Sequence, residues 1–231
     1  MPETLIGILA GMGPRSTAPF LEAVYDQCQL QYGATYDNDY PPILVYSLPT
    51  PFYLDRLIDH RALRAAIAAG LRKLEQAGAG YIAMPCNTAH LYYDQLRQEL
   101  GVPLLNIVSE TMGCLPQEAR RVTVLATPST LEAGVYQAGL AAAGHRLICA
   151  RDWQSRITAL IQMIKAKTDR RIIGEAWNGL LETVRCAGAD TVILACTDLS
   201  PLAEEAPAGM LVLDSAQALA KAVVNRYRNA G

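Results

Sequence analysis

The chain has 231 residues, enough for one large domain or for two compact domains of roughly 100 residues each. Hydrophobic residues make up 51% and charged residues 18%, a composition typical of a globular protein and not of a disordered or fibrous one. With 20 basic and 22 acidic residues and a formal net charge of -2, the sequence shows no electrostatic footprint for nucleic acid or an anionic membrane, so a small molecule is the expected partner.

The sequence also bears on cellular location. No apolar segment reaches the ~20 residues that span a bilayer, and the first residues, MPETLIGILAGMGPRST, lack the basic region of a secretion signal. Six cysteines are too sparse for a disulfide scaffold and are expected to be thiols in a reducing compartment. We therefore expect a cytoplasmic protein.

Short apolar runs bounded by turn residues alternate along the chain with amphipathic segments. The runs predict buried strands at 5–10, 43–47, 81–84, 104–107, 121–126, 146–149, 191–195 and 210–213. The amphipathic segments predict helices at 17–31, 60–77, 89–100, 130–143, 155–165, 169–187 and 215–229. Alternation of this kind is typical of parallel sheets, and continuously apolar strands indicate helices on both sheet faces, so the predicted fold class is α/β.

The two halves of the chain resemble each other. Each has a Gly- or Thr-rich turn after an early strand (GMGPRST, then ATPST) and a later strand that ends in a cysteine-bearing turn. We predict two similar domains, each a parallel sheet flanked by helices, with the active site in the cleft between them. The predicted bounds are 1–101 plus 214–231 for the first domain and 102–213 for the second.

The cysteine-bearing turns are MPCNTAH, with Cys86, and LACTDLS, with Cys196, and the two cysteines lie 110 residues apart. Each follows an apolar strand, and ligands in α/β sheets bind outside the carboxyl ends of the strands. A thiol beside a helix N-terminus is favoured as thiolate, the reactive form. A lone cysteine is most often a small buried hydrophobe, but the repetition of the turn favours a functional pair.

The other cysteines and the histidines carry less information. We interpret Cys28, Cys114, Cys149 and Cys186 as structural, because they lack polar company and the spacing of metal ligands. The histidines at 60, 90 and 145 also lack such a spacing, so no metal is expected.

Several polar residues have two possible roles. The loop at 11–17 leaves a strand and opens a predicted helix, so it could bind an anion such as a carboxylate, but it matches neither a dinucleotide motif nor a P-loop. Thr127, Ser129 and Thr130 are either helix caps or carboxylate ligands. Arg56 is either a surface residue or a clamp for a substrate carboxylate.

In GMGPRST, MPCNTAH and ACTDL the sequence resembles the aspartate/glutamate racemase superfamily over nearly its whole length, and the stretch YDNDYPPILVYSLPTPFYLDRLIDH resembles its broad-specificity amino-acid racemase branch. The resemblance implies a homodimer with Cys86 and Cys196 as the catalytic acid/base pair. It implies a set of residues near the amino-acid end of the substrate: Met12, Asn87, Thr88, Thr127, Thr130 and Thr197. Arg56 and Lys165 resemble contacts to a side-chain carboxylate. Ala195 and Asp198 depart from the Gly and Glu of the family pattern.

Racemisation needs one group that removes the Cα proton and another that returns a proton on the opposite face, so two facing cysteines are sufficient. No lysine stands in a context typical of a pyridoxal enzyme, and no cofactor is expected. Two alternatives stay open: an isomerase or decarboxylase of the same fold that uses one cysteine on a small dicarboxylate, and a catalytically silent carboxylate-binding protein. The substrate, acidic or broader, also stays open.

Overall fold

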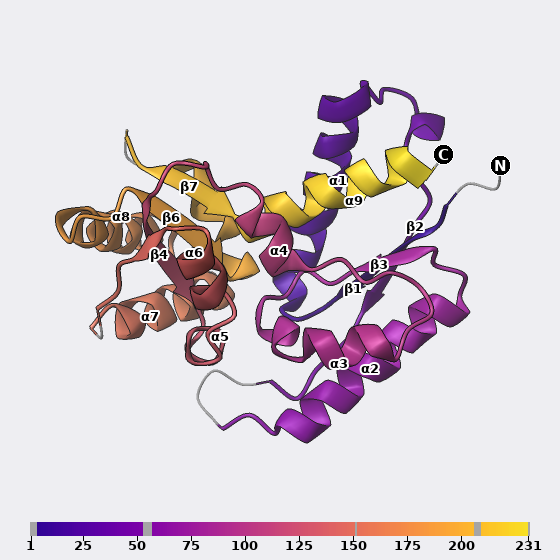
Figure 1. The fold of residues 1–231 in the computed structure, drawn as a ribbon, viewed down its shortest axis with the longest axis horizontal. Helices are drawn as coiled ribbons and strands as arrows, with labels where there is room; N and C mark the ends of the chain where they lie inside the picture. Colours follow the sequence, from indigo (N-terminus) through magenta and orange to yellow (C-terminus); the bar gives the residue numbers. More distant parts are fainter. Residues whose placement is uncertain (1–3, 53–56, 151, 206–208, 231) are drawn as a thin grey trace. The chain divides into compact units, whose positions relative to one another are not determined.

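The computed structural model describes residues 4–52, 57–150, 152–205 and 209–230 (Figure 1). Parallel strands alternate with helices along the chain, and the strands form two separate sheets. The predicted α/β class with two helix-flanked parallel sheets is therefore confirmed. The chain divides into two compact units: unit 1 contains the described parts of Met1–Glu110 and Ala216–Gly231, and unit 2 is Thr111–Ser215.

The sheet of unit 1 has the strand order β2-β1-β3, all parallel. Its strands are β1 (Ile6–Ala10), β2 (Ile43–Ser47) and β3 (Tyr81–Ala83). The helices of unit 1 are η1 (Pro14–Ser16), α1 (Thr17–Tyr32), η2 (Asp37–Asp39), α2 (His60–Gln76), η3 (Thr88–Tyr92), α3 (Tyr93–Gln98), α4 (Ile107–Met112, which runs on into unit 2) and α9 (Ser215–Ala230, which begins in unit 2).

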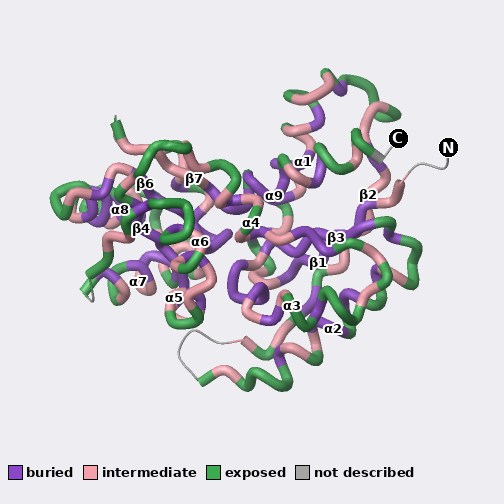
Figure 2. Tube along the Cα trace, in the orientation of Figure 1, coloured by how far each residue is buried: buried purple, intermediate pink, exposed green. Residues whose placement is uncertain are grey.

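Side chains of β1 alternate between two apolar layers, as the twofold periodicity of a strand requires. Ile6 and Ile8 pack in one cluster with residues of α1 and α9, whereas Leu9 packs in another with residues of α2 and α3. Figure 1 shows these helices on the two faces of the sheet. Because both faces are covered, β1 and β3 are buried along their whole length, and Figure 2 shows them in the colour of buried residues. This explains the continuously apolar sequence of both strands.

The sheet of unit 2 has the strand order β5-β4-β6-β7, again parallel. Its strands are β4 (Arg121–Ala126), β5 (Arg146–Leu147), β6 (Thr191–Ala195) and β7 (Leu211–Asp214). Its helices are α5 (Pro128–Glu132), α6 (Gln137–Ala142), α7 (Trp153–Lys165), α8 (Arg170–Cys186) and η4 (Thr197–Glu205). Trp177 of α8 is fully buried, and Trp153 of α7 is buried as well.

The sequence prediction was wrong in one strand. Residues 104–107 form only a single bridge, Leu104 with Ile82, because α4 begins at Ile107. The Asn106 side chain accepts hydrogen bonds from the backbone N–H groups of Val108 and Ser109 and so starts the helix. The bridge to Ile82 keeps this segment with the first sheet, and the compact unit 1 extends to Glu110. The predicted domain bounds, 1–101 plus 214–231 and 102–213, stay a prediction.

Two predicted helices are shorter or interrupted. The segment 130–143 is divided between α5 and α6, and Gly134 between them has a φ of 67°, in the left-handed region that ends helices. The segment 89–100 begins as the 3-10 helix η3 before α3. No helix in the described parts of the chain is long and apolar enough to cross a membrane.

Candidate active site

Cys86 lies three residues after β3, at the carboxyl edge of the first sheet. Its backbone N–H donates to the carbonyl oxygen of Met84 (2.8 Å), which bends the chain sharply at Pro85. The 3-10 helix η3 starts two residues later at Thr88, and Asn87 and Thr88 are buried. The Cys86 side chain itself is half-buried. We call residues 84–90 the first elbow.

His90 holds the first elbow from inside. Its Nδ1 lies 2.8 Å from the carbonyl oxygen of Cys86, and its Nε2 lies 3.1 Å from the backbone nitrogen of Ile107. The side chain is buried, and burial lowers its pKa, an effect that hydrogen bonds to the carbonyl oxygens of Cys86 and Leu105 oppose. His90 is therefore neutral at physiological pH and acts within the structure as a fixed hydrogen-bonding group.

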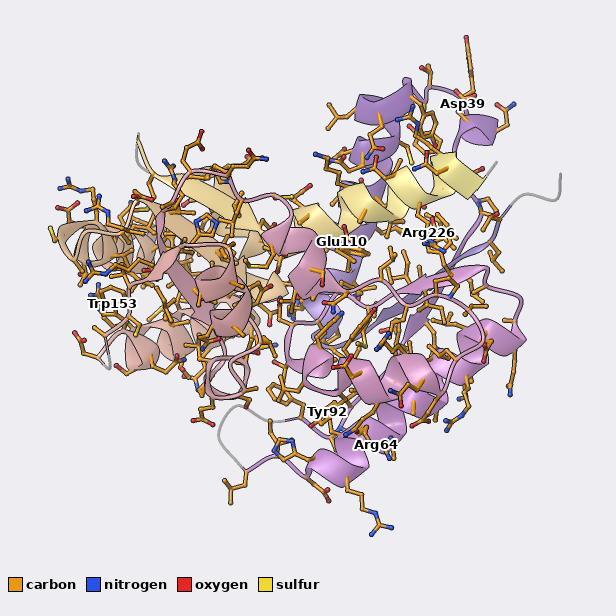
Figure 3. The ribbon with its side chains drawn as sticks, viewed as in Figure 1. Asp39, Arg64, Tyr92, Glu110, Trp153 and Arg226 are labelled. Carbon is orange, nitrogen blue, oxygen red and sulfur yellow. The ribbon has the colours of Figure 1, made fainter. Side chains whose placement is uncertain are left out.

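The end of η3 is fixed as well. The hydroxyl of Tyr92, labelled in Figure 3, lies 2.8 Å from Nδ1 of His60 at the start of α2. The ring of Tyr93 stacks on the His90 imidazole with centroids 5.7 Å apart and planes 10° apart, and its hydroxyl donates to the carbonyl oxygen of Leu104 (2.9 Å). The residues after Cys86 are thus anchored to α2 and to the segment that precedes α4.

The glycine-rich loop follows β1, the strand beside β3. Gly11 has a φ of 90°, and a Cβ atom there would lie 2.5 Å from the backbone nitrogen of Leu48, so only glycine fits. The Gly11 N–H donates to Oγ1 of Thr17 (3.2 Å), and the Ser16 hydroxyl donates to the carbonyl oxygen of Gly13 (2.9 Å). These two hydroxyl groups stabilise the loop itself, whereas Met12 packs half-buried beside the α2 side of the core.

Cys196 follows β6 directly, at the carboxyl edge of the second sheet. Its carbonyl oxygen accepts from the backbone N–H of Leu199 (2.9 Å), because η4 begins at Thr197. Cys196 and Thr197 are both buried, with 8% and 4% exposure. We call residues 195–200 the second elbow. Each unit therefore places a cysteine where a strand that pairs with the first strand of its sheet ends.

The second elbow carries an ion pair. Oδ2 of Asp198 lies 2.7 Å from Nζ of Lys165, the last residue of α7, and 3.9 Å from the sulfur of Cys196. The Asp198 side chain is 7% exposed and the Lys165 side chain 35%. Lys165 thus contacts the second elbow. The resemblance assigns its ammonium group to a substrate carboxylate, but within unit 2 that group already pairs with the carboxylate of Asp198.

Thr127 and Thr130 lie beside the second elbow, because β4 pairs with β6 and Ala126 stands opposite Ala195. The Thr127 hydroxyl caps α5: it accepts from the backbone N–H of Thr130 (3.4 Å) and lies 3.0 Å from the Thr130 hydroxyl. The capping role that the sequence allowed is therefore confirmed, and the carboxylate-binding role stays a prediction. Arg56, the other predicted clamp, lies outside the described residues.

Sequence reasoning missed the role of two side chains in the elbows. From the sequence, His90 was tested only for the spacing of metal ligands. Its position four residues after Cys86 also allows a contact with that residue. The sequence marks Asp198 as a departure from the family pattern, and its pairing with Lys165 across 33 residues has no signal in the spacing. Among the described residues, no group of three or more His, Cys, Asp or Glu side chains is placed to hold a metal ion.

The fold and the site together define a class of protein: an α/β protein with two parallel sheets and a cysteine elbow at the carboxyl edge of each sheet. The Asp/Glu/Hydantoin racemase family model matches residues 9–223, so the chain belongs to this family. The Broad specificity amino-acid racemase RacX of Bacillus subtilis is 44% identical over 223 residues, 96% of this chain and 98% of the relative. A glutamate racemase of Shewanella woodyi is 30% identical over 154 residues, 64% of this chain and 57% of that protein.

Solved structures give the same result. The aspartate racemase of Picrophilus torridus superposes with a TM-score of 0.82 at 26% identity, covering 97% of this chain and 94% of that one. The glutamate racemase isoform RacE1 of Bacillus anthracis has a TM-score of 0.71 at 16% identity, covers all of this chain and 84% of its own, and supports the fold alone. The resemblance drawn from GMGPRST, MPCNTAH and ACTDL is confirmed.

Proposed function

We propose that the protein is a cofactor-independent amino-acid racemase that uses Cys86 and Cys196 as the two acid/base groups. The observation that carries this proposal is the duplicated elbow, which sets one thiol at the carboxyl edge of each parallel sheet. The proposal requires the two edges to face one substrate from opposite sides. The chain belongs to the Asp/Glu/Hydantoin racemase family and is 44% identical to RacX, and both observations support amino acids as the substrate class.

The proposed reaction balances without any other reactant. One cysteine, as thiolate, takes the Cα proton, so the Cα–H bond breaks and an S–H bond forms. The electron pair left on Cα is delocalised into the substrate carboxylate. The second cysteine, as thiol, donates its proton to the opposite face of Cα, and the two cysteines exchange roles for the reverse direction. Proton transfer by each positioned group is worth about 10²–10⁴-fold in rate.

The carbanion-like state also needs donors aimed at the substrate carboxylate. We assign this role to the turns that follow the cysteines, through Asn87, Thr88 and Thr197. Their burial supports the assignment, because hydrogen bonds to a developing negative charge are stronger where water is excluded. Met12 and Thr127 follow strands adjacent to the cysteine strands, Thr130 lies in the first turn of α5, and these three residues complete the proposed set.

We propose a broad substrate range and not a strictly acidic one. The ammonium group of Lys165 already pairs with Asp198 at 2.7 Å, so an acidic substrate side chain has to compete with a carboxylate of the protein. The identity to a relative named as having broad specificity supports the same choice. The role of Arg56 as a second carboxylate contact stays a prediction.

The deciding experiment follows L-amino acids, including Asp, Glu, Lys and Arg, in D₂O by loss of the Cα–H signal and by appearance of the D-enantiomer. The variants Cys86→Ala and Cys196→Ala are expected to lose about 10²-fold or more of the racemisation rate, and Cys149→Ala, at an exposed thiol, serves as the matched control. A silent binding protein gives neither signal, and a one-cysteine isomerase or decarboxylase keeps its reaction on a small dicarboxylate in one of the two variants. Full racemisation in either variant contradicts the two-base assignment.

We further propose that the enzyme works as a homodimer in the cytoplasm. The six free thiols suit a reducing compartment, and the dimer rests on the family resemblance. Light scattering on a size-exclusion column measures the assembly directly. A mass of 25.0 kDa, that of one chain, across the working concentration range contradicts the dimer.

A further inference from the structure

The imidazole of His90 connects the first elbow to the start of α4. Nδ1 lies 2.8 Å from the Cys86 carbonyl oxygen and Nε2 lies 3.1 Å from the backbone nitrogen of Ile107. These contacts define the position of the proton. A carbonyl oxygen only accepts, so Nδ1 must carry the hydrogen, and Nε2 must accept from the Ile107 N–H. Nε2 also lies 3.4 Å from the carbonyl oxygen of Leu105, a longer contact than the one with the Ile107 nitrogen. The neutral tautomer protonated at Nδ1 is the one that satisfies the two shorter contacts.

The surroundings of His90 hold this tautomer and orientation. Burial lowers the pKa of His90, which disfavours the doubly protonated ring. Tyr93 stacks on one face of the ring, with its own hydroxyl bound to the carbonyl oxygen of Leu104. The imidazole therefore has no freedom to rotate without losing two hydrogen bonds and a stacking contact.

We propose that His90 is a positioning residue for Cys86: its Nδ1–H fixes the Cys86 carbonyl, so that the thiol and the Asn87 N–H keep the geometry that proton transfer requires. This inference rests on the proposed function. A second effect acts through the peptide bond between Cys86 and Asn87. A donor on the Cys86 carbonyl polarises that amide, so its N–H, which belongs to Asn87, becomes a stronger donor toward a bound anion.

The second elbow holds its cysteine carbonyl with the backbone. There η4 begins immediately after Cys196, and the Leu199 N–H satisfies the Cys196 carbonyl at 2.9 Å. In the first elbow, η3 begins only at Thr88, and the N–H of His90 bonds to Asn87 and not to Cys86. The imidazole of His90 takes the place that a helical N–H has in unit 2.

Two near-isosteric variants separate the two nitrogens. In His90→Asn the amide nitrogen can occupy the position of Nδ1 and keep the bond to the Cys86 carbonyl. In His90→Gln the amide reaches the position of Nε2, so the Ile107 N–H keeps an acceptor and the Cys86 carbonyl loses the hydrogen bond that Nδ1–H donates. Both variants remove the ring and its stacking on Tyr93, and they differ in which hydrogen bond is kept: the bond to the Cys86 carbonyl in His90→Asn and the bond to the Ile107 N–H in His90→Gln.

Two readouts are measured on each variant. In racemisation, we expect kcat of His90→Asn to stay within about three-fold of wild type and kcat of His90→Gln to fall about ten- to a hundred-fold with KM little changed, because a misplaced acid/base group affects the chemical step. The second readout is the alkylation rate of Cys86 by iodoacetamide, followed by peptide mapping, with the exposed Cys149 as reference. This rate should change several-fold in His90→Gln only, since only there does the Cys86 carbonyl lose its donor.

Equal values of kcat and of Cys86 alkylation in the two variants overturn the inference, whether both match wild type or both fall with the thermal midpoint. If His90→Gln does not fold, His90→Ala replaces it, and His90→Asn must still exceed it in kcat. A wild type without racemase activity refutes the proposed function, and the alkylation ranking then still decides the role of His90. The two failures are therefore distinguishable.

Discussion

The two cysteine elbows occupy equivalent places in their sheets but are built with different chemistry. In the first, a neutral buried imidazole holds the Cys86 carbonyl. In the second, backbone of η4 holds the Cys196 carbonyl, and an ion pair between Lys165 and Asp198 lies beside the thiol. The difference teaches that duplication preserves the position of the thiol at the strand end, while each unit supplies the supporting groups independently.

The turns that accompany the elbows differ in the same way. Unit 1 has Gly11 after β1, where backbone approaches so closely that no side chain fits. Unit 2 has Thr127 after β4, and its hydroxyl caps α5. One turn depends on the absence of a side chain and the other on its presence. Substitutions in the two turns should therefore act through different physical terms, and the four predictions below test this comparison.

The largest effect is expected for Gly11→Ala. The new methyl group would lie 2.5 Å from the Leu48 nitrogen at a φ of 90°, so we expect a loss of about 3 kcal/mol or more in the free energy of unfolding. Gly33→Ala is the control, because its φ of 75° brings the same backbone strain with open space around the site, and about 1 kcal/mol should be lost. Chemical denaturation measures both, and equal losses would show that the close approach to Leu48 carries no cost.

Asp198→Asn tests the charge of the second elbow. It removes the carboxylate that lies 3.9 Å from the Cys196 sulfur and leaves the Lys165 ammonium nearby, which favours the thiolate of Cys196. We expect Cys196 to be alkylated about ten-fold faster near neutral pH, a difference of about 1.4 kcal/mol. Cys86 in the same protein is the internal control and should not change. Asp198→Glu, which keeps the charge, should behave like wild type; a similar acceleration in that variant would contradict an electrostatic cause.

His90 should make stability depend on pH. Because burial lowers its folded-state pKa, the unfolded chain binds a proton more readily, and stability is lost as the pH falls below the unfolded value of about 6.5. The slope from this residue is at most about 1.4 kcal/mol per pH unit. Between pH 7.5 and 5.5 we expect wild type to lose about 1 kcal/mol more than His90→Asn, which cannot titrate. Parallel stability curves for the two proteins would exclude this contribution.

The smallest effect is expected for Thr127→Ala, which removes the cap of α5. Its bond to the Thr130 N–H is long, 3.4 Å, so we expect a cost of about 0.5–1 kcal/mol, or roughly 1–4 °C in the thermal midpoint. Asp169→Ala is the matched cap variant: Asp169 accepts from the Arg171 N–H at 2.8 Å and caps α8. The Asp169 variant should lose at least as much stability, and the reverse order would mean that Thr127 has another structural role.

The parts of the fold that could be predicted from sequence are those with a strong local signal. The strands at 43–47, 121–126 and 191–195 agree with β2, β4 and β6 to the residue, because each is a continuous apolar run between turn residues. The segment 104–107 has the same composition, but Asn106 starts α4 and ends the pairing after Leu104. A single capping side chain outweighs the strand propensity there, and no apolar pattern reveals it.

The site was predictable to the same extent. The strand-end positions of Cys86 and Cys196 follow from runs and turns near each cysteine, and the structure places both at sheet edges. The ion pair of Lys165 with Asp198 could not be predicted, because it depends on how α7 packs beside η4. The contact of His90 with Ile107 depends likewise on the return of a later segment to the elbow.

The return of α9 to unit 1 sets an order of events during synthesis. Unit 2 is one continuous segment, 111–215, whereas the core of unit 1 includes Leu219 and Val223 of α9, and the Tyr81 hydroxyl donates to the Val223 carbonyl at 2.7 Å. On the ribosome, unit 2 can complete its core while the α9 side of the first sheet is still uncovered. Unit 1, although it starts first, therefore completes its core only after α9 has left the ribosome.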